Sequence, residues 1–356
     1  MNDFCRELGM TVPVVLAPMA GGPSTPQLAA AVSNAGGLGS LGVAYISPQN
    51  IADEIARVRA LTQGRFAVNL FSPQGMEPLR GNVAAAEKFV AAYHQRLGLA
   101  PPKLPQKSHE DFDQQMEVLI RERVPVVSFT FGLLPEKTIA ALKKQNLYII
   151  GTATTVEEAR LIEKNGADAV VAQGGEAGAH RGTFAVPFES ALIGTMALVP
   201  QVVDAVKIPV IASGGIMDGR GIVAALALGA SAVQMGTAFL ATSEAGTSPA
   251  YRAALRQARE DQTTVTRAFS GRMARGISNE FIEKWNASGL TPLSYPWQNA
   301  LTREMRRASG ASDPGLLSLW AGQGVPMMRE GPAAQLVHQL REEMGRAFAE
   351  LGGSIQ

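Results

Sequence analysis

The residue best suited to acid/base chemistry is His180, which lies in a glycine-rich loop. Residues 173–183 follow a short apolar run and hold one of the chain's four histidines. An imidazole changes charge near neutral pH, and a glycine-rich loop can bring it within hydrogen-bonding distance of a substrate. His180 is therefore predicted to be the catalytic proton-transfer residue. His94, His109 and His338 are expected to be surface or packing residues.

The charged neighbours of His180 are given supporting roles. Glu176 is expected to order the loop or form an ion pair, and Arg181 to be a surface or substrate-facing charge. No His, Asp and Glu set has metal-ligand spacing, and no Gly-x-Ser-x-Gly elbow is present. The pattern disfavours metal-assisted and serine hydrolysis.

Two further glycine loops are typical of phosphate binding. Gly214-Gly215 and Gly236-Thr237 end the last two candidate strands. Glycine lets backbone N–H groups approach a phosphate closely, and barrel enzymes often place a phosphate site after strands seven and eight. From the residues alone, the ligand could be a nucleotide or a phosphosugar.

A third group of residues could hold a planar ring. The first candidate strand ends in Ala17-Pro18-Met19-Ala20-Gly21-Gly22, an apolar bed whose main-chain N–H groups could contact ring heteroatoms. Asn69 and Gln173 are carboxamides at the ends of apolar strands, where burial is costly unless each binds a ligand or a neighbour.

Eight short apolar runs, most separated by helical patterns, would position these groups. Continuous apolarity is typical of parallel strands that are buried on both faces. The eight runs predict an α/β fold, a closed (β/α)₈ TIM barrel. The candidate strands are residues 14–17, 37–41, 66–70, 126–130, 147–150, 169–172, 208–212 and 232–235.

Two regions depart from the repeat. Residues 72–123 are too long for an ordinary connection after the third strand, and helical patterns at 83–97 and 110–122 predict a helical insertion that could act as a lid. Residues 246–356 are expected to form a helical segment that packs on the barrel and closes the active site. The barrel itself, with the insertion, is assigned to residues 1–245.

Composition narrows the range of partners. The chain has 32 Lys and Arg residues and 31 Asp and Glu residues. Its formal charge of +1 does not produce the strong positive field that would attract a nucleic acid or an anionic membrane. Cys5 is the single cysteine, which excludes an internal disulfide, and no apolar run approaches the length of a membrane span. A small-molecule partner and a cytoplasmic location are expected, with no signal peptide at the start of the chain.

These motifs together resemble the nitronate monooxygenase family, formerly called 2-nitropropane dioxygenase, in a class I-like form. The resemblance covers roughly residues 10–330 and rests on the segments 17–22, 29–39 and 173–182 with the two terminal glycine loops. It implies an FMN-binding barrel that oxidises alkyl nitronates with O₂ to a carbonyl compound and nitrite or nitrate. Detoxification of propionate 3-nitronate is the implied role.

The resemblance also assigns roles to single residues. His180 corresponds to the catalytic histidine, and Tyr295 to a residue near the substrate. The implied cofactor-binding residues are Pro18, Met19, Ala20, Asn69, Gln173, Gly178, Gly214, Gly215, Gln234, Gly236, Thr237, Gly322 and Gln323. The sequence departs from the family at Ala179, where a second glycine is common, so a slightly different loop path is expected.

Two alternative functions remain open from the sequence. An FMN-dependent NAD(P)H reductase of quinones or enoyl thioesters would share the flavin site and the histidine. A phosphosugar isomerase or lyase would use the phosphate loops without flavin. The chain could be a monomer or a homodimer.

Overall fold

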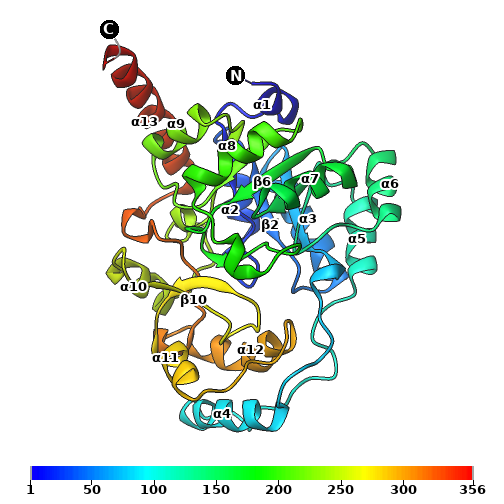
Figure 1. The fold of residues 1–356 in the computed structure, drawn as a ribbon, viewed down its shortest axis with the longest axis vertical. Coiled ribbons are helices and arrows are strands. Elements are labelled where there is room, and N and C mark those ends of the chain that lie inside the picture. Colours follow the sequence, from blue (N-terminus) through cyan, green and yellow to red (C-terminus); the bar gives the residue numbers. More distant parts are fainter. Residues whose placement is uncertain (1, 355–356) are drawn as a thin grey trace.

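The larger part of the molecule is a barrel of eight parallel strands, seen in a computed structural model that describes residues 2–354 (Figure 1). The strands are β1 (Val14–Leu16), β2 (Gly39–Gly42), β3 (Phe66–Phe71), β4 (Val126–Thr130), β5 (Tyr148–Ala153), β6 (Ala169–Gln173), β8 (Val210–Ser213) and β9 (Ala232–Met235). Their hydrogen-bonded order is β1-β9-β8-β6-β5-β4-β3-β2, and a parallel bridge between Val15 and Leu38 closes the ring. The predicted (β/α)₈ barrel is confirmed.

Eight helices surround the strands and bury their outer faces. They are α2 (Pro26–Asn34), α3 (Pro48–Leu61), α5 (Phe112–Arg121), α6 (Glu136–Lys144), α7 (Val156–Asn165), α8 (Thr195–Ala205), α9 (Gly219–Ala227) and α13 (Ala333–Ser354). Local sequence fixes their ends, as α7 illustrates. The Thr155 side chain accepts a hydrogen bond from the Glu158 N–H, and Gly166 ends the helix with φ of 102°.

The segment expected as an insertion after the third strand contains two helices that pack in different parts of the molecule. Helix α4 (Val83–Arg96) packs against α12 (Trp297–Ser309), away from the barrel. Helix α5 packs on β3, α3 and α6, with Met116 and Leu119 buried in the barrel core. The inserted part of residues 72–123 therefore ends before α5, because α5 is the regular barrel helix of this unit.

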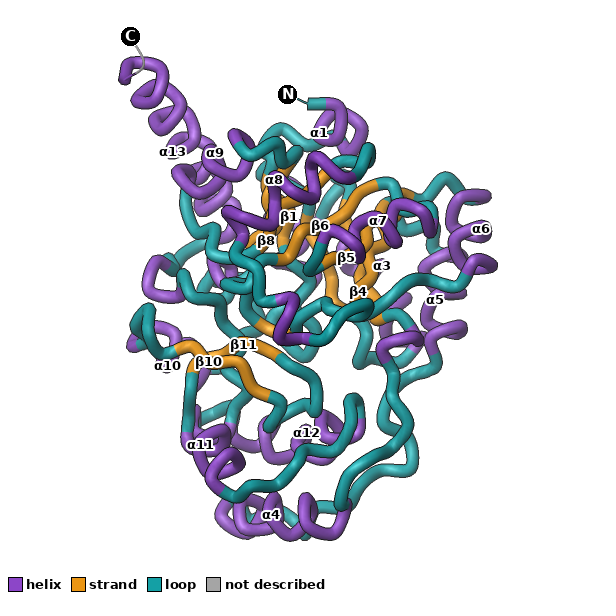
Figure 2. The backbone as a smooth tube through the Cα atoms, viewed as in Figure 1, coloured by secondary structure: helices purple, strands orange, loops and turns teal. Residues whose placement is uncertain are grey.

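A second, smaller lobe lies at the mouth of the barrel. It contains α10 (Pro249–Gln257), β10 (Thr263–Thr266), β11 (Ala274–Ile277), α11 (Glu280–Ala287) and α12, joined by α4 from the earlier segment. Its own core is aromatic, built around Phe89, Phe269, Phe281 and Trp285. Figure 2 shows β10 and β11 on the side of this lobe that faces the barrel.

The C-terminal residues 246–356 thus differ in two ways from the expected helical segment. They contain the strands β10 and β11, and β11 pairs with the two-residue strand β7 (Ala179–His180) in a small antiparallel sheet. The last helix, α13, packs against α9 and α2 and completes the ring of barrel helices. The second lobe is consequently inserted between the eighth strand and the eighth helix of the barrel.

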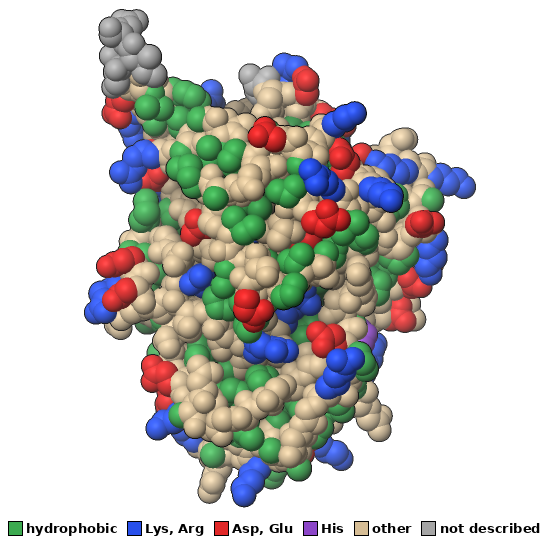
Figure 3. Space-filling view, in the orientation of Figure 1, with side chains coloured by type: hydrophobic (Ala, Val, Ile, Leu, Met, Phe, Trp, Pro, Cys, Tyr) green, Lys and Arg blue, Asp and Glu red, His purple; other side chains and the backbone are tan. Residues whose placement is uncertain are grey.

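The remaining elements are short. Helix α1 (Asp3–Leu8) buries Phe4 and Leu8 against the end of the barrel opposite the second lobe (Figure 1). The 3₁₀ turns are η1 (Pro73–Gly75), η2 (Phe188–Ala191), η3 (Thr237–Phe239), η4 (Pro314–Leu316) and η5 (Val325–Met327). Within residues 2–354 we find no helix with the length and apolarity to cross a bilayer. Acidic and basic side chains are interspersed on the face in Figure 3, in keeping with the near-zero net charge.

Candidate active site

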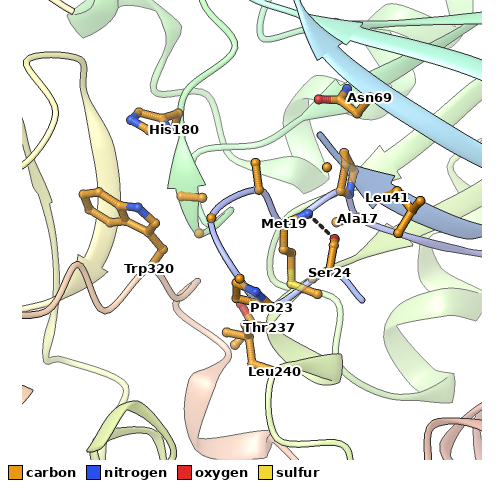
Figure 4. Close-up of a pocket in the computed structure, with 18 of the residues that line it drawn as sticks. Ala17, Met19, Pro23, Ser24, Leu41, Asn69, His180, Thr237, Leu240 and Trp320 are labelled. Carbon is orange, nitrogen blue, oxygen red and sulfur yellow. Dashed lines mark hydrogen bonds between the residues drawn. The ribbon is translucent and has the colours of Figure 1, made fainter. Parts of the chain in front are cut away.

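A cavity of about 890 Å³ lies at the carboxyl ends of the barrel strands and extends to the second lobe. Its walls come from the segment after β1, from β2, β3, β4, β5, β6, β8 and β9, from the His180 loop, and from α12 and the segment around Trp320. Figure 4 shows His180, Asn69 and Trp320 around this cavity. The cavity brings together most residues selected from the sequence. Those that line it are Pro18, Met19, Ala20, Asn69, Gln173, Gly178, His180, Gly214, Gly215, Gln234, Gly236, Thr237 and Gly322.

Strand pairing and one hydroxyl group hold His180 in place. The residue pairs with Ala274 across the small sheet, and its Nε2 lies 2.8 Å from the buried Oγ of Ser270. The same Oγ lies 2.9 Å from the carbonyl oxygen of Arg272, to which it donates. A hydroxyl has one proton to donate, so every contact is satisfied when His180 Nε2–H donates to Ser270. Nδ1 is then the unprotonated nitrogen.

The environment keeps the imidazole neutral. Burial, aided by the positive charges of Arg272 and Arg306, lowers the pKa of His180 to about 3. Within residues 2–354, no hydrogen bond to Nδ1 is formed. A neutral ring with a free lone pair at Nδ1 can accept a proton or a hydrogen bond from a ligand in the cavity.

Side chains of the loop itself fix its path. The Gln173 Nε2 donates to the His180 carbonyl at 3.0 Å, and its Oε1 accepts from the Gly182 N–H at 2.8 Å. The Glu176 carboxylate accepts from the Thr195 N–H at 2.9 Å and from the Thr195 hydroxyl at 2.8 Å. The expectation that Glu176 orders the loop is confirmed. Both polar atoms of the Gln173 carboxamide thus bind the backbone of the loop, and the residue also lines the cavity.

Arg181 has a different role from the one expected. It is 1% exposed, and its guanidinium donates to the carbonyls of Gln173 at 2.9 Å, Ala191 at 3.0 Å and Gly174. Burial lowers its pKa to about 10, so it stays charged at neutral pH. The expectation of a surface or substrate-facing charge was wrong, because carbonyl groups of the loop and of η2 surround this side chain.

The loop keeps a left-handed turn despite the alanine at position 179. Ala179 has φ of 64°, in the region that normally favours glycine. Strand pairing with Arg275 and the anchored residues on either side hold it there. The expected change of loop path is not needed; the methyl group is accommodated in a strained conformation instead.

The ends of β8 and β9 form a cradle of main-chain donors. Gly214 and Gly215 have φ of 120° and 71°, and Gly236 leads into η3. Among the described residues, the N–H groups of Gly215, Gly236 and Thr237 have no backbone or side-chain acceptor. Free N–H groups beside a cavity suit an anionic phosphate, so the residues fit the terminal phosphate of FMN.

The second lobe is tied directly to this cradle. The Gly322 N–H donates to the Thr237 Oγ1 at 2.9 Å, and the Gln323 N–H donates to the Glu176 carbonyl at 3.0 Å. A Cβ on Gly178 would approach the Ala321 carbonyl carbon at 2.5 Å, so the two segments meet with no room for a side chain. The segment of residues 321–323 therefore helps to form the cavity wall.

The bed expected for a flat ring is present, with one difference. Met19 and Ala20 line the cavity, but the Met19 N–H donates to the Ser24 Oγ at 2.8 Å and is not free for a ligand (Figure 4). The Asn69 Nδ2 donates to the Ser128 Oγ at 3.0 Å. The Gln234 carboxamide forms no hydrogen bond within the described part of the chain and faces the cavity.

Two selected residues lie outside the cavity lining. Tyr295 is 1% exposed; its hydroxyl lies 3.2 Å from that of Tyr45, and its ring centroid is 5.6 Å from that of His180. Tyr45 lines the cavity in its place. The Gln323 side chain points to solvent, and only its backbone contacts the His180 loop.

Several functional neighbours of His180 were not found from the sequence. Ser270 and Arg272 follow it by about ninety residues and reach it only because β11 pairs with β7. The guanidinium of Arg272 lies 4.0 Å above the ring of Phe131. Trp320, whose ring centroid is 5.6 Å from that of His180, was detectable as an aromatic residue in a glycine-containing segment. In the described chain there is no cluster of three or more His, Cys, Asp or Glu suited to a metal.

Comparison with known proteins identifies the family. The model described as nitronate monooxygenase matches residues 2–343. The chain belongs to the nitronate monooxygenase family. It is 42% identical over 349 residues to a probable nitronate monooxygenase of Staphylococcus aureus strain Newman, covering 96% of this chain and 98% of the relative. It is therefore an enzyme of an oxidoreductase family.

Solved structures of two kinds resemble the whole chain. A nitroalkane oxidase from Streptomyces ansochromogenes has a TM-score of 0.89 and 42% identity, covering 98% of this chain and 99% of its own. FabK from Thermotoga maritima has a TM-score of 0.77 and 31% identity, covering 99% of each chain. The arrangement of barrel and second lobe is thus also found in FabK, a protein with a different name.

Proposed function

We propose that this protein is an FMN-dependent nitronate monooxygenase, with propionate 3-nitronate as the favoured substrate. The observation that carries the proposal is His180 Nδ1, a free proton acceptor in the same cavity as the N–H groups of Gly215, Gly236 and Thr237, which have no acceptor among the described residues. The names of the Staphylococcus and Streptomyces relatives support oxidation of a nitronate or nitroalkane. The products are a carbonyl compound and nitrite.

The proposed cofactor site follows the shape of the cavity. Gly215, Gly236 and Thr237 bind the phosphate of FMN through their N–H groups, while Met19 and Ala20 support the ring. The Gln234 carboxamide is free to donate or accept at the ring edge. The chemistry that FMN supplies when bound is electron transfer from the nitronate to O₂. The protein orients the reactants and excludes water.

His180 acts in this proposal as a base. With Nε2–H engaged by Ser270 and the ring neutral, Nδ1 offers a lone pair and no hydrogen. It takes the α-proton of a neutral nitro compound, giving the nitronate and an imidazolium. In this tautomer Nδ1 has no hydrogen to donate to a nitronate oxygen.

One experiment tests cofactor and electron donor together. The purified protein is expected to carry FMN, and anaerobic mixing with propionate 3-nitronate is expected to bleach the flavin absorption. Bleaching by NADH alone would favour a quinone or enoyl-thioester reductase instead. A colourless protein that binds no added FMN would favour a phosphosugar isomerase or lyase.

His180→Asn tests the role of the base. We expect the variant to retain FMN and to oxidise a preformed nitronate far better than the corresponding neutral nitroalkane, because only the latter needs proton removal. Unchanged turnover of the neutral nitroalkane would remove His180 from the mechanism.

A further inference from the structure

One wall of the cavity carries an excess of positive charge that the flavin site does not use. Helix α12 contributes Arg303, Arg306 and Arg307 to the lining. Arg57 adds a fourth arginine, while Asp53 and Glu54 are the acidic lining residues, and Arg57 is paired with Glu54 at 2.7 Å. The remaining positive charge is concentrated on α12.

Arg306 is the least exposed of the three α12 arginines, and it contacts only neutral acceptors. Its Nη2 donates to the carbonyl of Asn299 at 2.9 Å and to the Oδ1 of Asn299 at 2.8 Å. Its Nε donates to the Thr302 Oγ1 at 3.2 Å, and its Nη1 reaches the Ser318 Oγ at 3.4 Å. Within residues 2–354 it forms no ion pair. A partly buried guanidinium without an acidic partner favours an anion beside it, and Arg306 faces a cavity that could hold one.

The position of Arg306 connects it to the proposed chemistry. Ser318, which its Nη1 contacts, lies two residues before Trp320, and the Trp320 ring centroid is 5.6 Å from that of His180. Burial lowers the pKa of Arg306 to about 10, so it remains charged at neutral pH. Its charge in turn contributes to the lowered pKa of His180. The guanidinium therefore lies within electrostatic reach of the base.

We propose that Arg306 binds a carboxylate at the end of the substrate remote from the nitro group, so that the enzyme selects carboxylate-bearing nitro compounds and nitronates. This rests on the proposed nitronate oxidation. The contacts to Asn299 and Thr302 fix the guanidinium plane, and the long contact of Nη1 leaves this nitrogen able to donate to a ligand. A planar guanidinium recognises a carboxylate more specifically than an ammonium group does.

Selectivity between two matched substrates tests the proposal. Propionate 3-nitronate is compared with the nitronate of 3-methyl-1-nitrobutane, in which an isopropyl group replaces the carboxylate. Arg306→Gln is expected to lower the ratio of their kcat/KM values about tenfold to a hundredfold, which is the usual effect of losing a hydrogen bond to a charged group. Arg306→Lys should retain part of the selectivity. Arg160→Gln, a change of an exposed arginine on α7, should leave the ratio as in the wild type.

A binding measurement gives a second readout that needs no turnover. Succinate has the shape and charge of propionate 3-nitronate but cannot be oxidised by this chemistry. Calorimetry on the FMN-loaded protein is expected to give a dissociation constant at least about tenfold weaker for Arg306→Gln than for the wild type and Arg160→Gln. If Arg306→Gln does not fold, Arg306→Lys carries the comparison.

The outcomes separate this inference from the proposed function. An unchanged selectivity ratio, or succinate binding that is equal in wild type and Arg306→Gln or absent from the wild type, overturns the carboxylate site. Arg306-dependent succinate binding by an enzyme that oxidises neither nitronate supports the carboxylate site and overturns the proposed reaction.

Discussion

The Nε2 atom of His180 lies 2.8 Å from the Oγ atom of Ser270, although ninety residues separate them in the chain. The Ser270 hydroxyl also donates to the Arg272 carbonyl at 2.9 Å, so its proton is already used. Nε2 must then carry the imidazole hydrogen, and Nδ1 is left as the acceptor. The serine is thus a positioning residue that selects the tautomer needed for a base.

Removal of this hydroxyl should slow the proton-transfer step. We expect Ser270→Ala to lower kcat for a neutral nitroalkane about tenfold, near the upper end for one hydrogen bond, because the imidazole then populates both tautomers. Preformed nitronate should be affected less, and Ser270→Thr should restore much of the rate. Ser190→Ala, at an exposed serine, is the control. Equal loss on both substrates would indicate a purely structural role for Ser270.

The lowered pKa of His180 predicts a pH effect on stability. The pKa is about 3 in the folded protein against a usual value near 6.5, so the unfolded state binds a proton that the folded state does not. Above about pH 6.5 both states are neutral here, and the group contributes no pH dependence. As the pH falls below that value toward 3, the folded state is progressively destabilised.

Urea unfolding at pH 7.5 and pH 5.0 checks this sign. The wild type is expected to lose more of its unfolding free energy between the two pH values than His180→Gln, which has no imidazole to protonate. A matching loss in both proteins would mean that His180 titrates normally in the folded state.

The buried guanidinium of Arg181 should be essential to the stability of the catalytic loop. Arg181→Met removes the guanidinium donor from three carbonyl groups, of which that of Gly174 keeps the Ala177 N–H, and we expect a loss of about 3 kcal/mol in unfolding free energy together with weaker FMN binding. Arg160→Met on the exposed face of α7 should change stability by no more than about 0.5 kcal/mol. Urea unfolding and FMN titration measure the two effects; equal stability of both variants would contradict the assigned role.

The strained turn at Ala179 predicts a stabilising substitution. A left-handed conformation costs a non-glycine residue about 1–2 kcal/mol, and glycine loses about 0.5–1 kcal/mol in chain entropy. Ala179→Gly should therefore raise the unfolding free energy by up to about 1 kcal/mol. Ala177→Gly in the same loop, where φ is not positive, should lower it. Thermal unfolding of the two variants at equal FMN concentration tests the contrast, and a loss in Ala179→Gly would show that the turn is not strained.

The sequence predicted the barrel and the residues on its strand ends well. Buried parallel strands are continuous apolar runs, and the residue that follows such a run must lie at the barrel mouth. That is why Asn69, Gln173, Gly214 and Gly236 were recognised as cavity residues before any contact was known. Such signals are local, and each can be read from a few neighbouring positions.

The contacts made across the second lobe could not be predicted in this way. Ser270 reaches His180, and Ser318 reaches Arg306, through the pairing of β11 with β7 and the packing of α12. No local pattern reports such long-range contacts, and strand β7 is only two residues long. The sequence predicts Tyr295 at the substrate, whereas packing places it behind His180. Tyr45 lines the cavity instead.

The sequence by itself determined the barrel, the glycine cradle and the identity of the histidine, because residue type and spacing dictate backbone conformation over short distances. Tertiary structure alone decided the tautomer of that histidine, the burial of Arg181 and the uncompensated charge of Arg306. These properties depend on which distant groups exclude water and supply hydrogen-bond partners, and only the folded chain brings those groups together.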